Sequence, residues 1–325
     1  MEFAPLVWVE IGRKIPRYLK ANIRLHHQMY PSREQILITD KPAPISVRKV
    51  CKVIVIDNLD IETQRLLMVS SMRRTTKQID FWINTSRRFF YLHEFMVKSG
   101  TKKLIHSESD NVILQLEVID NYFKQNDWGL AYSLQADEIG CASILMVNGE
   151  KTLEEFNRHI VDGWREIDQD DMKLLGTFSN HPKVHLLPVL GKEDFLFDAG
   201  TYGRFLLGTE ARNLRLPFSR RGLIDSKKGA IDVWKEKLKF SFDKSQKKIL
   251  ISSKFQVSQL VNIHIHSKRI PKNSKKFWSI IRKDIKNIGR KKWFFGHLDF
   301  GVLLERLVSW FTRRIMRKDI DFRLR

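Results

Sequence analysis

The sequence has little cysteine and no long uninterrupted apolar run. Cys51 and Cys141 are its only cysteines among 325 residues, and they lack the spacing of a structural metal site. Two cysteines cannot build a disulfide framework, so we expect a reducing compartment. No apolar run approaches the roughly 20 residues that a membrane-spanning helix needs. The first residues also lack a basic segment followed by a long apolar one, so we expect a cytoplasmic protein without a secretory signal.

Acidic residues are scarce relative to basic ones. The chain has 58 Lys and Arg against 37 Asp and Glu, a formal net charge of +21. From Lys272 to Arg325 the count is 16 basic against 5 acidic residues, so about half of the excess lies in the last sixth of the chain. Such a basic segment attracts polyanions, either nucleic acid or anionic lipid.

The hydrophobic content of 42% is sufficient for a large core, and its periodicity predicts alternating strands and helices. The predicted strands are Leu6–Ile11, Gln35–Thr39, Val50–Ile56, Lys103–Ser107, Gly129–Leu134 and Ala142–Val147. Helices are predicted from about Pro16 and over Phe81–Val97, Val112–Lys124, Leu153–Val161 and Asp171–Phe178. This alternation predicts an α/β sandwich with a mostly parallel sheet. We expect the strand within Lys244–Ser253 to be the last of that sheet.

Two carboxylates follow one of these strands. In the run L-I-H-S-E-S-D, the strand period of two places Glu108 and Asp110 on the same side of the chain as it leaves the sheet. Carboxylates that converge at a strand end can hold Mg²⁺ or Mn²⁺, which prefer hard oxygen ligands. A solvated acidic turn is the alternative, and for this tripeptide alone it is the commoner outcome.

A second polar group lies near the end of the apolar pattern. The run L-V-N-I-H-I-H-S-K alternates as a strand does, which puts His264 and His266 on one face with Lys268 just beyond. An imidazole ligand and an ammonium group would then reach the same site, a combination that suits a diphosphate leaving group. The alternative is a pair of packed or surface histidines.

Five runs together resemble a known family. An arginine-bearing helix, F-W-I-N-T-S-R-R-F-F-Y-L-H-E-F-M, precedes L-I-H-S-E-S-D-N, and I-D-Q-D-D-M-K-L-L, F-D-A-G-T-Y-G-R-F-L-L-G-T-E and N-I-H-I-H-S-K follow in order. They resemble bacterial and viral sugar transferases of the GT-A fold, over roughly Val7 to Lys268. The resemblance implies a GT-A-like, mostly parallel sheet sandwiched by helices. It also divides the chain into a transferase domain, residues 1–270, and a helical basic C-terminal extension, residues 271–325.

The resemblance implies roles on the donor side. Glu108 and Asp110 occupy the positions of the Asp-X-Asp pair, which grips the Mn²⁺ or Mg²⁺ that bridges the two phosphates of a UDP- or GDP-sugar. Arg88 matches the helix arginine that contacts this donor. One of His264 and His266 would complete the metal shell. Lys268 would neutralise charge on the departing nucleoside diphosphate.

Three aspartates are candidates on the acceptor side. In this resemblance Asp170 or Asp171 deprotonates an acceptor hydroxyl or binds sugar hydroxyls. A helix cap is the favoured alternative for either one, because Asp is common at the start of a helix. Asp198 precedes two glycines that let the backbone approach a ligand, so it is a candidate sugar contact. A glycine-rich turn before an apolar helix is the alternative for Asp198.

The basic end of the chain predicts a surface contact. From Phe277 to Arg325, aromatic residues are interleaved with Lys and Arg, and an apolar stripe at helical spacing runs from Phe300 to Ile315. This pattern is typical of a basic amphipathic helix that lies in an anionic membrane interface, here at the inner face of the membrane. Packing of the stripe on the enzyme domain is the alternative.

Three function classes remain open from the sequence. The first is a metal-dependent glycosyltransferase of polysaccharide biosynthesis, which moves a sugar from a nucleotide sugar to a glycan or lipid-linked acceptor. The second is a metal-dependent enzyme acting on nucleic acid, and the third is a basic binding protein without chemistry. The stripe of the C-terminal segment is unlike the dispersed aromatic platforms that stack bases, so we do not expect nucleic acid as the partner. The order of the five runs favours the transferase.

Overall fold

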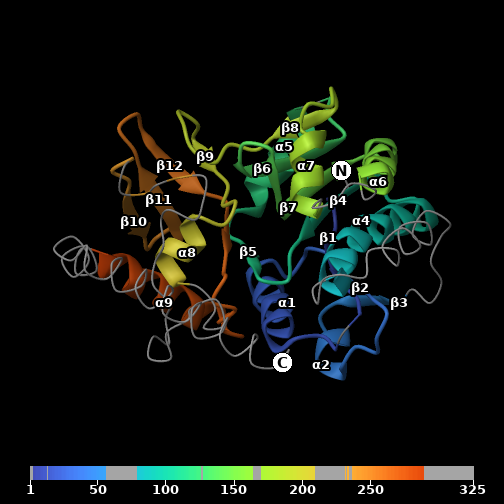
Figure 1. Ribbon diagram of the computed structural model, residues 1–325. Coiled ribbons are helices and arrows are strands. Elements are labelled where there is room, and N and C mark those ends of the chain that lie inside the picture. Colours follow the sequence, from blue (N-terminus) through green and yellow to red (C-terminus); the bar gives the residue numbers. More distant parts are fainter. Residues whose placement is uncertain are drawn as a thin grey trace, which may run out of the picture.

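The structure is a computed structural model. It describes residues 3–12, 14–55, 79–125, 127–163, 170–208 and 231–288, without 232, 234 and 235. A seven-stranded sheet forms its centre, in the order β3-β2-β1-β4-β7-β6-β8 (Figure 1). The strands are β1 (Leu6–Glu10), β2 (Gln35–Thr39), β3 (Lys52–Val55), β4 (Lys103–Ser107), β6 (Leu130–Ala136), β7 (Ile139–Asn148) and β8 (Val184–Leu186). The pairs β1–β2, β1–β4, β2–β3 and β6–β8 are parallel, and β7 runs antiparallel to β4 and β6.

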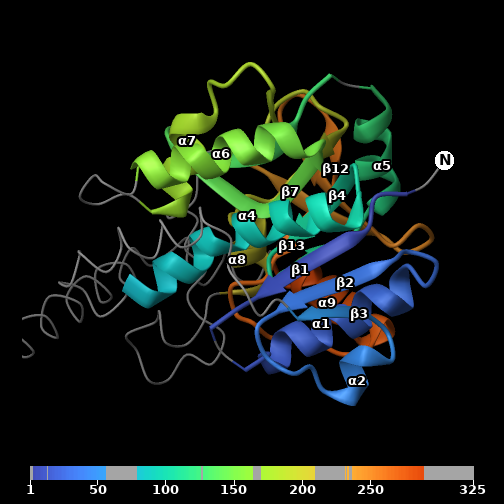
Figure 2. The same cartoon turned by 90° about the vertical axis from the view of Figure 1, so that its right-hand side faces the viewer.

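Helices cover both faces of this sheet (Figure 2). One face packs against α4 (Ile79–Ser99), α6 (Glu150–Gly163) and α7 (Asp171–Phe178). The other packs against α1 (Arg17–Met29), α2 (Ile45–Arg48) and α5 (Leu116–Gln125). Strands buried on both faces need apolar residues at nearly every position, which explains runs such as Q-I-L-I-T in β2. The predicted fold class, a mostly parallel sheet sandwiched by helices, is confirmed.

A second, smaller sheet lies beside the first. It contains β10 (Lys239–Asp243), β11 (Lys248–Ser252), β12 (Val257–Leu260) and β9 (Phe195–Leu196), in the order β10-β11-β12-β9. The prediction that the strand within Lys244–Ser253 completes the main sheet is therefore wrong. The strand is β11, and it pairs antiparallel with its sequence neighbours β10 and β12. Its burial alternates along the strand, as expected of a sheet that is covered on one face.

Two helices pack on the small sheet, α8 (Tyr202–Leu207) and α9 (Ser274–Lys286). The apolar side of α9 is buried there through Phe277, Trp278 and Ile281. This finding supports packing for the first part of the predicted C-terminal extension, while the boundary at residue 270 stays a prediction. The apolar stripe from 300 to 315 lies outside the described residues. Across the part of the chain that the structure describes, no helix combines the length and hydropathy needed to cross a membrane.

A two-stranded ribbon connects the two halves of the molecule. β5 (Asn111–Ile113) runs antiparallel to β13 (Asn262–His264), with Asn111 opposite His264. The prediction of a helix starting at Val112 is wrong at its first residues, because these backbone groups pair with β13 and α5 begins only at Leu116. The predicted strand through Lys268 is likewise too long, since β13 ends at His264.

Candidate functional site

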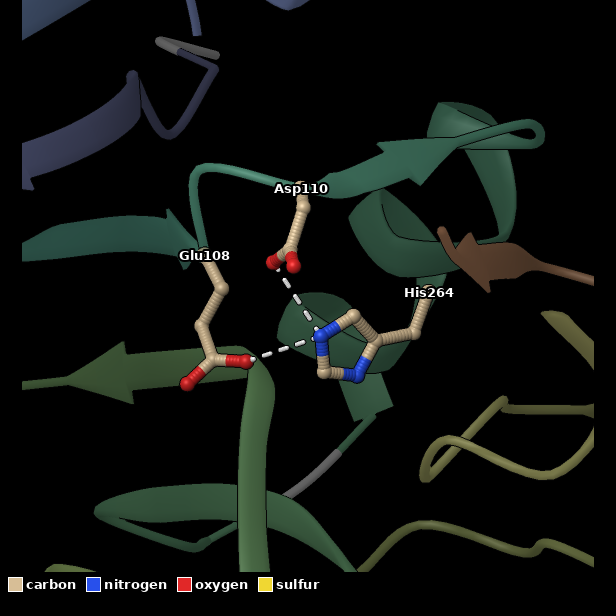
Figure 3. A group of neighbouring side chains, drawn as sticks. All are labelled: Glu108, Asp110 and His264. Atoms are coloured by element: carbon tan, nitrogen blue, oxygen red, sulfur yellow. Dashed lines mark hydrogen bonds and ion pairs between the residues drawn. The ribbon is translucent and has the colours of Figure 1, made fainter. Parts of the chain in front are cut away.

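Two carboxylates and one imidazole converge where the ribbon leaves the main sheet (Figure 3). Glu108 and Asp110 lie in the loop between β4 and β5, and His264 ends β13. The Nε2 atom of His264 is 3.1 Å from Asp110 Oδ1 and 3.3 Å from Glu108 Oε2. One ligand atom from each of the three residues lies within 4.8 Å of the others. The structure thus brings His264 to two carboxylates that precede it by more than 150 positions.

Backbone and amide hydrogen bonds fix this loop. The buried Asn22 on α1 donates to the carbonyl oxygens of Ser109 at 3.1 Å and Asn111 at 2.8 Å. The backbone N–H of Ile265 donates to the Asp110 carbonyl oxygen at 2.8 Å. Because Asn111 pairs with His264 in the ribbon, Asp110 is held beside the imidazole. The ribbon register therefore determines the geometry of the cluster.

Asp198 holds the backbone of His264 in place. Its fully buried carboxylate accepts four backbone N–H groups, from Gly200 at 2.8 Å, Tyr202 at 2.9 Å, Gly203 at 2.7 Å and His264 at 2.9 Å. Burial raises the pKa of Asp198, and these hydrogen bonds oppose the rise. A Cβ on Gly203 would lie 1.9 Å from the His264 carbonyl oxygen, so only glycine allows this approach. The structure therefore gives Asp198 a positioning role for His264.

His266 and Lys268 line the same cavity as His264. The ring centroids of the two histidines are 4.2 Å apart. Burial and the neighbouring positive His264 lower the pKa of His266 to about 2. Lys268 has a left-handed backbone, with φ of 54°, in a turn in which its N–H donates to the Ile265 carbonyl oxygen. Its ammonium lies 5.4 Å from the ring centroid of Tyr18. The turn, rather than a continued strand, brings the predicted Lys268 to the site.

The cavity has a volume of about 490 Å³ and opens at the carboxyl ends of β1 and β4. Its wall is made by residues from β1, α1, α4, the β4–β5 loop and the segment after β13. They are Val9, Glu10, Ile11, Gly12, Tyr18, Asn84, Thr85, Arg88, Glu108, Ser109, Asp110, His264, His266 and Lys268. Carboxyl ends of strands are where open α/β sheets bind ligands.

Arg88 joins the cluster to α7. Its Nη1 donates to Glu108 Oε1 at 2.6 Å, and its Nη2 donates to Asp171 Oδ2 at 2.7 Å. Burial alone would lower the pKa of Arg88, but the two carboxylates outweigh it and raise the pKa. Burial raises the pKa of Asp171 to about 6, although Arg88 opposes this. Glu108 is therefore shared between a fixed cation on one side and His264 on the other.

The predicted acceptor-side aspartates lie away from the cavity wall. Asp170 is the N-cap of α7 and accepts the N–H of Lys173 at 2.9 Å. Asp171 is buried against Arg88, and Asp198 is buried beneath His264. The cavity wall contains none of these three carboxylates. The structure thus shows a contact for each that explains its position, and their catalytic roles stay predictions.

The cluster has the donor set of a divalent-cation site. Burial alone would raise the pKa of Asp110, but the His264 charge outweighs it and lowers the pKa to about 2. The same attraction, from Asp110 and Glu108, overcomes burial and holds the pKa of His264 well above its ordinary value. A proton on Nε2 is therefore shared between two carboxylates, where a cation would bind the same atoms. The two carboxylates suit Mn²⁺ or Mg²⁺, and the imidazole favours Mn²⁺, because Mg²⁺ takes oxygen ligands.

Three buried polar residues of the site were missed from the sequence. Glu10, at the end of β1, lines the cavity and accepts the Ser109 hydroxyl at 2.9 Å. Asn22 holds the carboxylate loop, and Asn262 bonds the Asn111 side chain at 2.7 Å and the Asp198 backbone. A polar residue that ends an apolar strand is the signal that could have revealed Glu10, as it revealed Glu108.

Comparisons with known proteins give structural similarity without sequence similarity. No family model matches the chain, and no curated protein matches it. One similar solved structure is the galactosyltransferase LgtC in complex with donor and acceptor sugar analogues. It has a TM-score of 0.41 and 12% identity, over 57% of this chain and 73% of that one.

Two further similar structures have lower scores. Mouse xyloside xylosyltransferase 1 has a TM-score of 0.37 and 11% identity, over 57% of this chain and 85% of that one. The glycosyltransferase GlyE of Streptococcus pneumoniae has a TM-score of 0.38 and 14% identity, over 57% of this chain and 45% of that one. These scores describe a partial likeness, so the function proposed below rests on the cavity and its residues.

Proposed function

We propose that the protein is a metal-dependent glycosyltransferase that moves a sugar from a nucleoside-diphosphate sugar to a glycan or lipid-linked acceptor. The observation that carries the proposal is the cluster of Glu108, Asp110 and His264 on the wall of a cavity of about 490 Å³, with Lys268 on the same wall. A cation site and a lysine together suit a diphosphate. The sequence resemblance to GT-A transferases supports this choice over other phosphate chemistry.

In this proposal the chain's own residues divide the work. Glu108, Asp110 and His264 would hold Mn²⁺ or Mg²⁺, which when bound supplies positive charge for the two phosphates of the donor. Lys268 places an ammonium group where the leaving phosphate oxygen gains charge as its bond to the anomeric carbon breaks. Glu10 and Asn84, on the wall of the same cavity, offer hydrogen-bonding groups for donor hydroxyls.

Arg88 has a different role here from the donor contact implied by the resemblance. Both of its terminal nitrogens already bond carboxylates, Glu108 and Asp171. We propose that Arg88 first of all orients Glu108, so that Oε2 faces His264 and the cation site. Asp171 supports that orientation from α7. Since Arg88 also lines the cavity, a donor phosphate would meet it at the edge that faces Glu108.

Binding of nucleotides tests the proposal directly. The melting temperature of the full chain is measured with UDP, GDP, UDP-glucose, UDP-galactose and GDP-mannose, with and without Mn²⁺. A ligand that binds the folded state raises the melting temperature by mass action. We expect a Mn²⁺-dependent rise with one nucleotide class. Asp110→Asn removes a ligand charge and should abolish the rise.

The matched control is Asp127→Asn, which changes an exposed carboxylate paired with Lys183. It should leave the nucleotide effect intact. Release of nucleoside diphosphate from the donor that binds then tests turnover. If no nucleotide raises the melting temperature, with or without Mn²⁺, the cavity does not bind this donor class and the proposal fails.

A further inference from the structure

The helix α9 has two faces of opposite character. Its inner face is apolar and buried, through Phe277, Trp278 and Ile281. Its outer face carries a row of exposed cations at helical spacing: Lys275, Lys276, Arg282, Lys283 and Lys286, with Lys272 just before the helix. We call these six residues the basic face. Figure 1 shows α9 (red) at the margin of the molecule, next to α8 and β10.

The basic face is not neutralised by its own helix. The only acidic residue of α9 is Asp284, and it lies on the buried side. In the other half of the molecule several exposed cations have acidic partners on the surface. Lys98 pairs with Glu94, Lys102 with Glu150, and Arg158 with Glu154. Five like charges along roughly 20 Å of helix repel one another, so the arrangement stabilises contact with an anion rather than the fold.

We infer that the basic face is a docking surface for anionic phospholipid headgroups. Each Lys or Arg held near an anionic bilayer adds to binding, and a straight row of them matches a flat charged surface. Phe277 and Trp278 are turned into the core, so α9 contacts headgroups through charge and inserts no apolar side chain. The apolar stripe that the sequence predicts to enter the interface, from residue 300 to 315, lies outside the described residues.

Two features favour lipid over nucleic acid as the occupant. Proteins that grip single strands combine cations with exposed aromatic rings, and both aromatic residues of α9 are buried. The chain that follows α9 also continues the pattern that suits a bilayer. Residues 289–325 carry 10 Lys and Arg against 4 Asp and Glu, together with the apolar stripe at helical spacing.

The basic face is linked to the cavity through α1. Tyr18, near the start of α1, lines the cavity, whereas Gln28, near its end, accepts the N–H of Ser274 at 3.0 Å and donates to the Lys272 carbonyl oxygen at 3.3 Å. Lys268 of the cavity wall lies only four residues before Lys272. Docking of α9 on a bilayer therefore fixes the orientation of the cavity relative to that bilayer.

Vesicle flotation of the full chain tests the inference without any activity assay. We would use vesicles of phosphatidylcholine alone and of phosphatidylcholine with phosphatidylglycerol. The test variant is K275Q/K276Q/R282Q/K283Q. The control, K98Q/K102Q/K151Q/R158Q, removes the same charge from exposed residues of the other half. Since one cation near the surface contributes about fivefold to binding, we expect the test variant to lose at least about tenfold in affinity for the anionic vesicles.

The control should retain most of the binding, and added salt should weaken the wild type. Equal losses in both variants would mean that net charge, and not α9, drives binding, which would overturn the inference. Unchanged binding of the test variant, or no wild-type binding to phosphatidylglycerol, would also overturn it. A parallel titration with single-stranded DNA detects the alternative occupant. Loss of DNA binding in the test variant with vesicle binding intact would assign the face to nucleic acid.

Discussion

Two regions of the molecule carry opposite charge although they share one chain, and we call them the acidic region and the basic region. Residues 79–163, which provide α4, β4, the ribbon strand β5 and the helices that follow, have 13 Asp and Glu against 8 Lys and Arg. Residues 236–288, which provide most of the small sheet and α9, have 3 against 14. The candidate site lies where these two regions meet. Its carboxylates, Glu108 and Asp110, come from the acidic region, and His264 and Lys268 come from the basic region.

This difference shows how a strongly basic protein can keep two neighbouring carboxylates in its candidate site. Positive charge close to the carboxylates would compete with a bound cation. The α9 helix carries five cations against one acid, whereas Glu108 at the cavity is paired with Arg88. The overall charge of the chain therefore describes its outer surface and says little about the site.

The largest expected effect comes from removing Arg88, the buried cation of the acidic region. Arg88→Met leaves Asp171 buried without its partner, which should cost about 3–5 kcal/mol of unfolding free energy. Urea denaturation measures the loss. Arg87→Met, at the neighbouring position with bonds to Asn84 and Tyr91, is the control and should cost less. Adding Asp171→Leu to Arg88→Met should restore part of the stability, and no restoration would contradict the pairing argument.

The next effect concerns Asp198, which accepts the N–H of His264 in the basic region. Asp198→Ala leaves buried backbone N–H groups without an acceptor, and we expect a loss of about 3 kcal/mol in unfolding free energy. Asp243→Ala serves as a matched control, because that carboxylate also accepts backbone N–H groups but in an exposed turn. The anchor role predicts weaker Mn²⁺ binding in Asp198→Ala, measurable by calorimetry. Equal losses in the two variants would argue against it.

A pH titration examines the contact between α1 and the ribbon. His26 is buried, and its Nε2 accepts the N–H of Ile113 in β5. Burial lowers the pKa of His26 to about 4. Between that value and the ordinary pKa the unfolded chain binds more protons, so stability is full above about pH 6.5 and falls as the pH drops. Urea denaturation should show a loss of roughly 2 kcal/mol from this residue between pH 6.5 and 5. His26→Leu should be less sensitive to pH, and an unchanged slope would contradict this account.

The smallest expected effect on stability distinguishes a helix cap from a general base at Asp170. Asp170→Ala removes the N-cap of α7 and should lower stability by about 1 kcal/mol. Asp170→Asn keeps a capping side chain and should lose less. A sugar-transfer assay on the same two variants compares their turnover with their stability. Turnover that falls strongly in Asp170→Asn would favour the general base predicted from the sequence over the cap seen in the structure.

Local chemistry made much of the fold predictable. Apolar runs such as Lys103–Ser107 and the capped segment Asp171–Phe178 form the predicted elements, because burial on both faces and an aspartate cap leave clear patterns. The second sheet was missed, since alternation within a strand does not reveal which sheet it joins. The start of α5 was misplaced because pairing with β13 overrides the helical pattern at Val112.

The site, like the fold, was predictable where a local pattern marks its residues and not where separate elements pack together. Glu108 and Asp110 are recognisable as carboxylates at a strand end, and the period of two led to His264, His266 and Lys268 although the strand stops early. Contacts between buried side chains of separate elements leave no pattern in the sequence. The bonds of Arg88 to Asp171 and of Asp198 to four backbone groups depend on how separate elements pack, which one sequence does not show.

The pairing of β5 with β13 has a consequence for the time at which the site forms. Asp110 and His264 are 154 residues apart, and the ribbon that aligns them closes a loop of that length. During synthesis the carboxylates leave the ribosome long before the histidine does, so the growing chain lacks His264 until more than 150 further residues have been added. Such a long-range pairing forms slowly relative to local helices and hairpins. Tight metal binding would therefore mark chains that have finished folding, and a truncated chain would lack it.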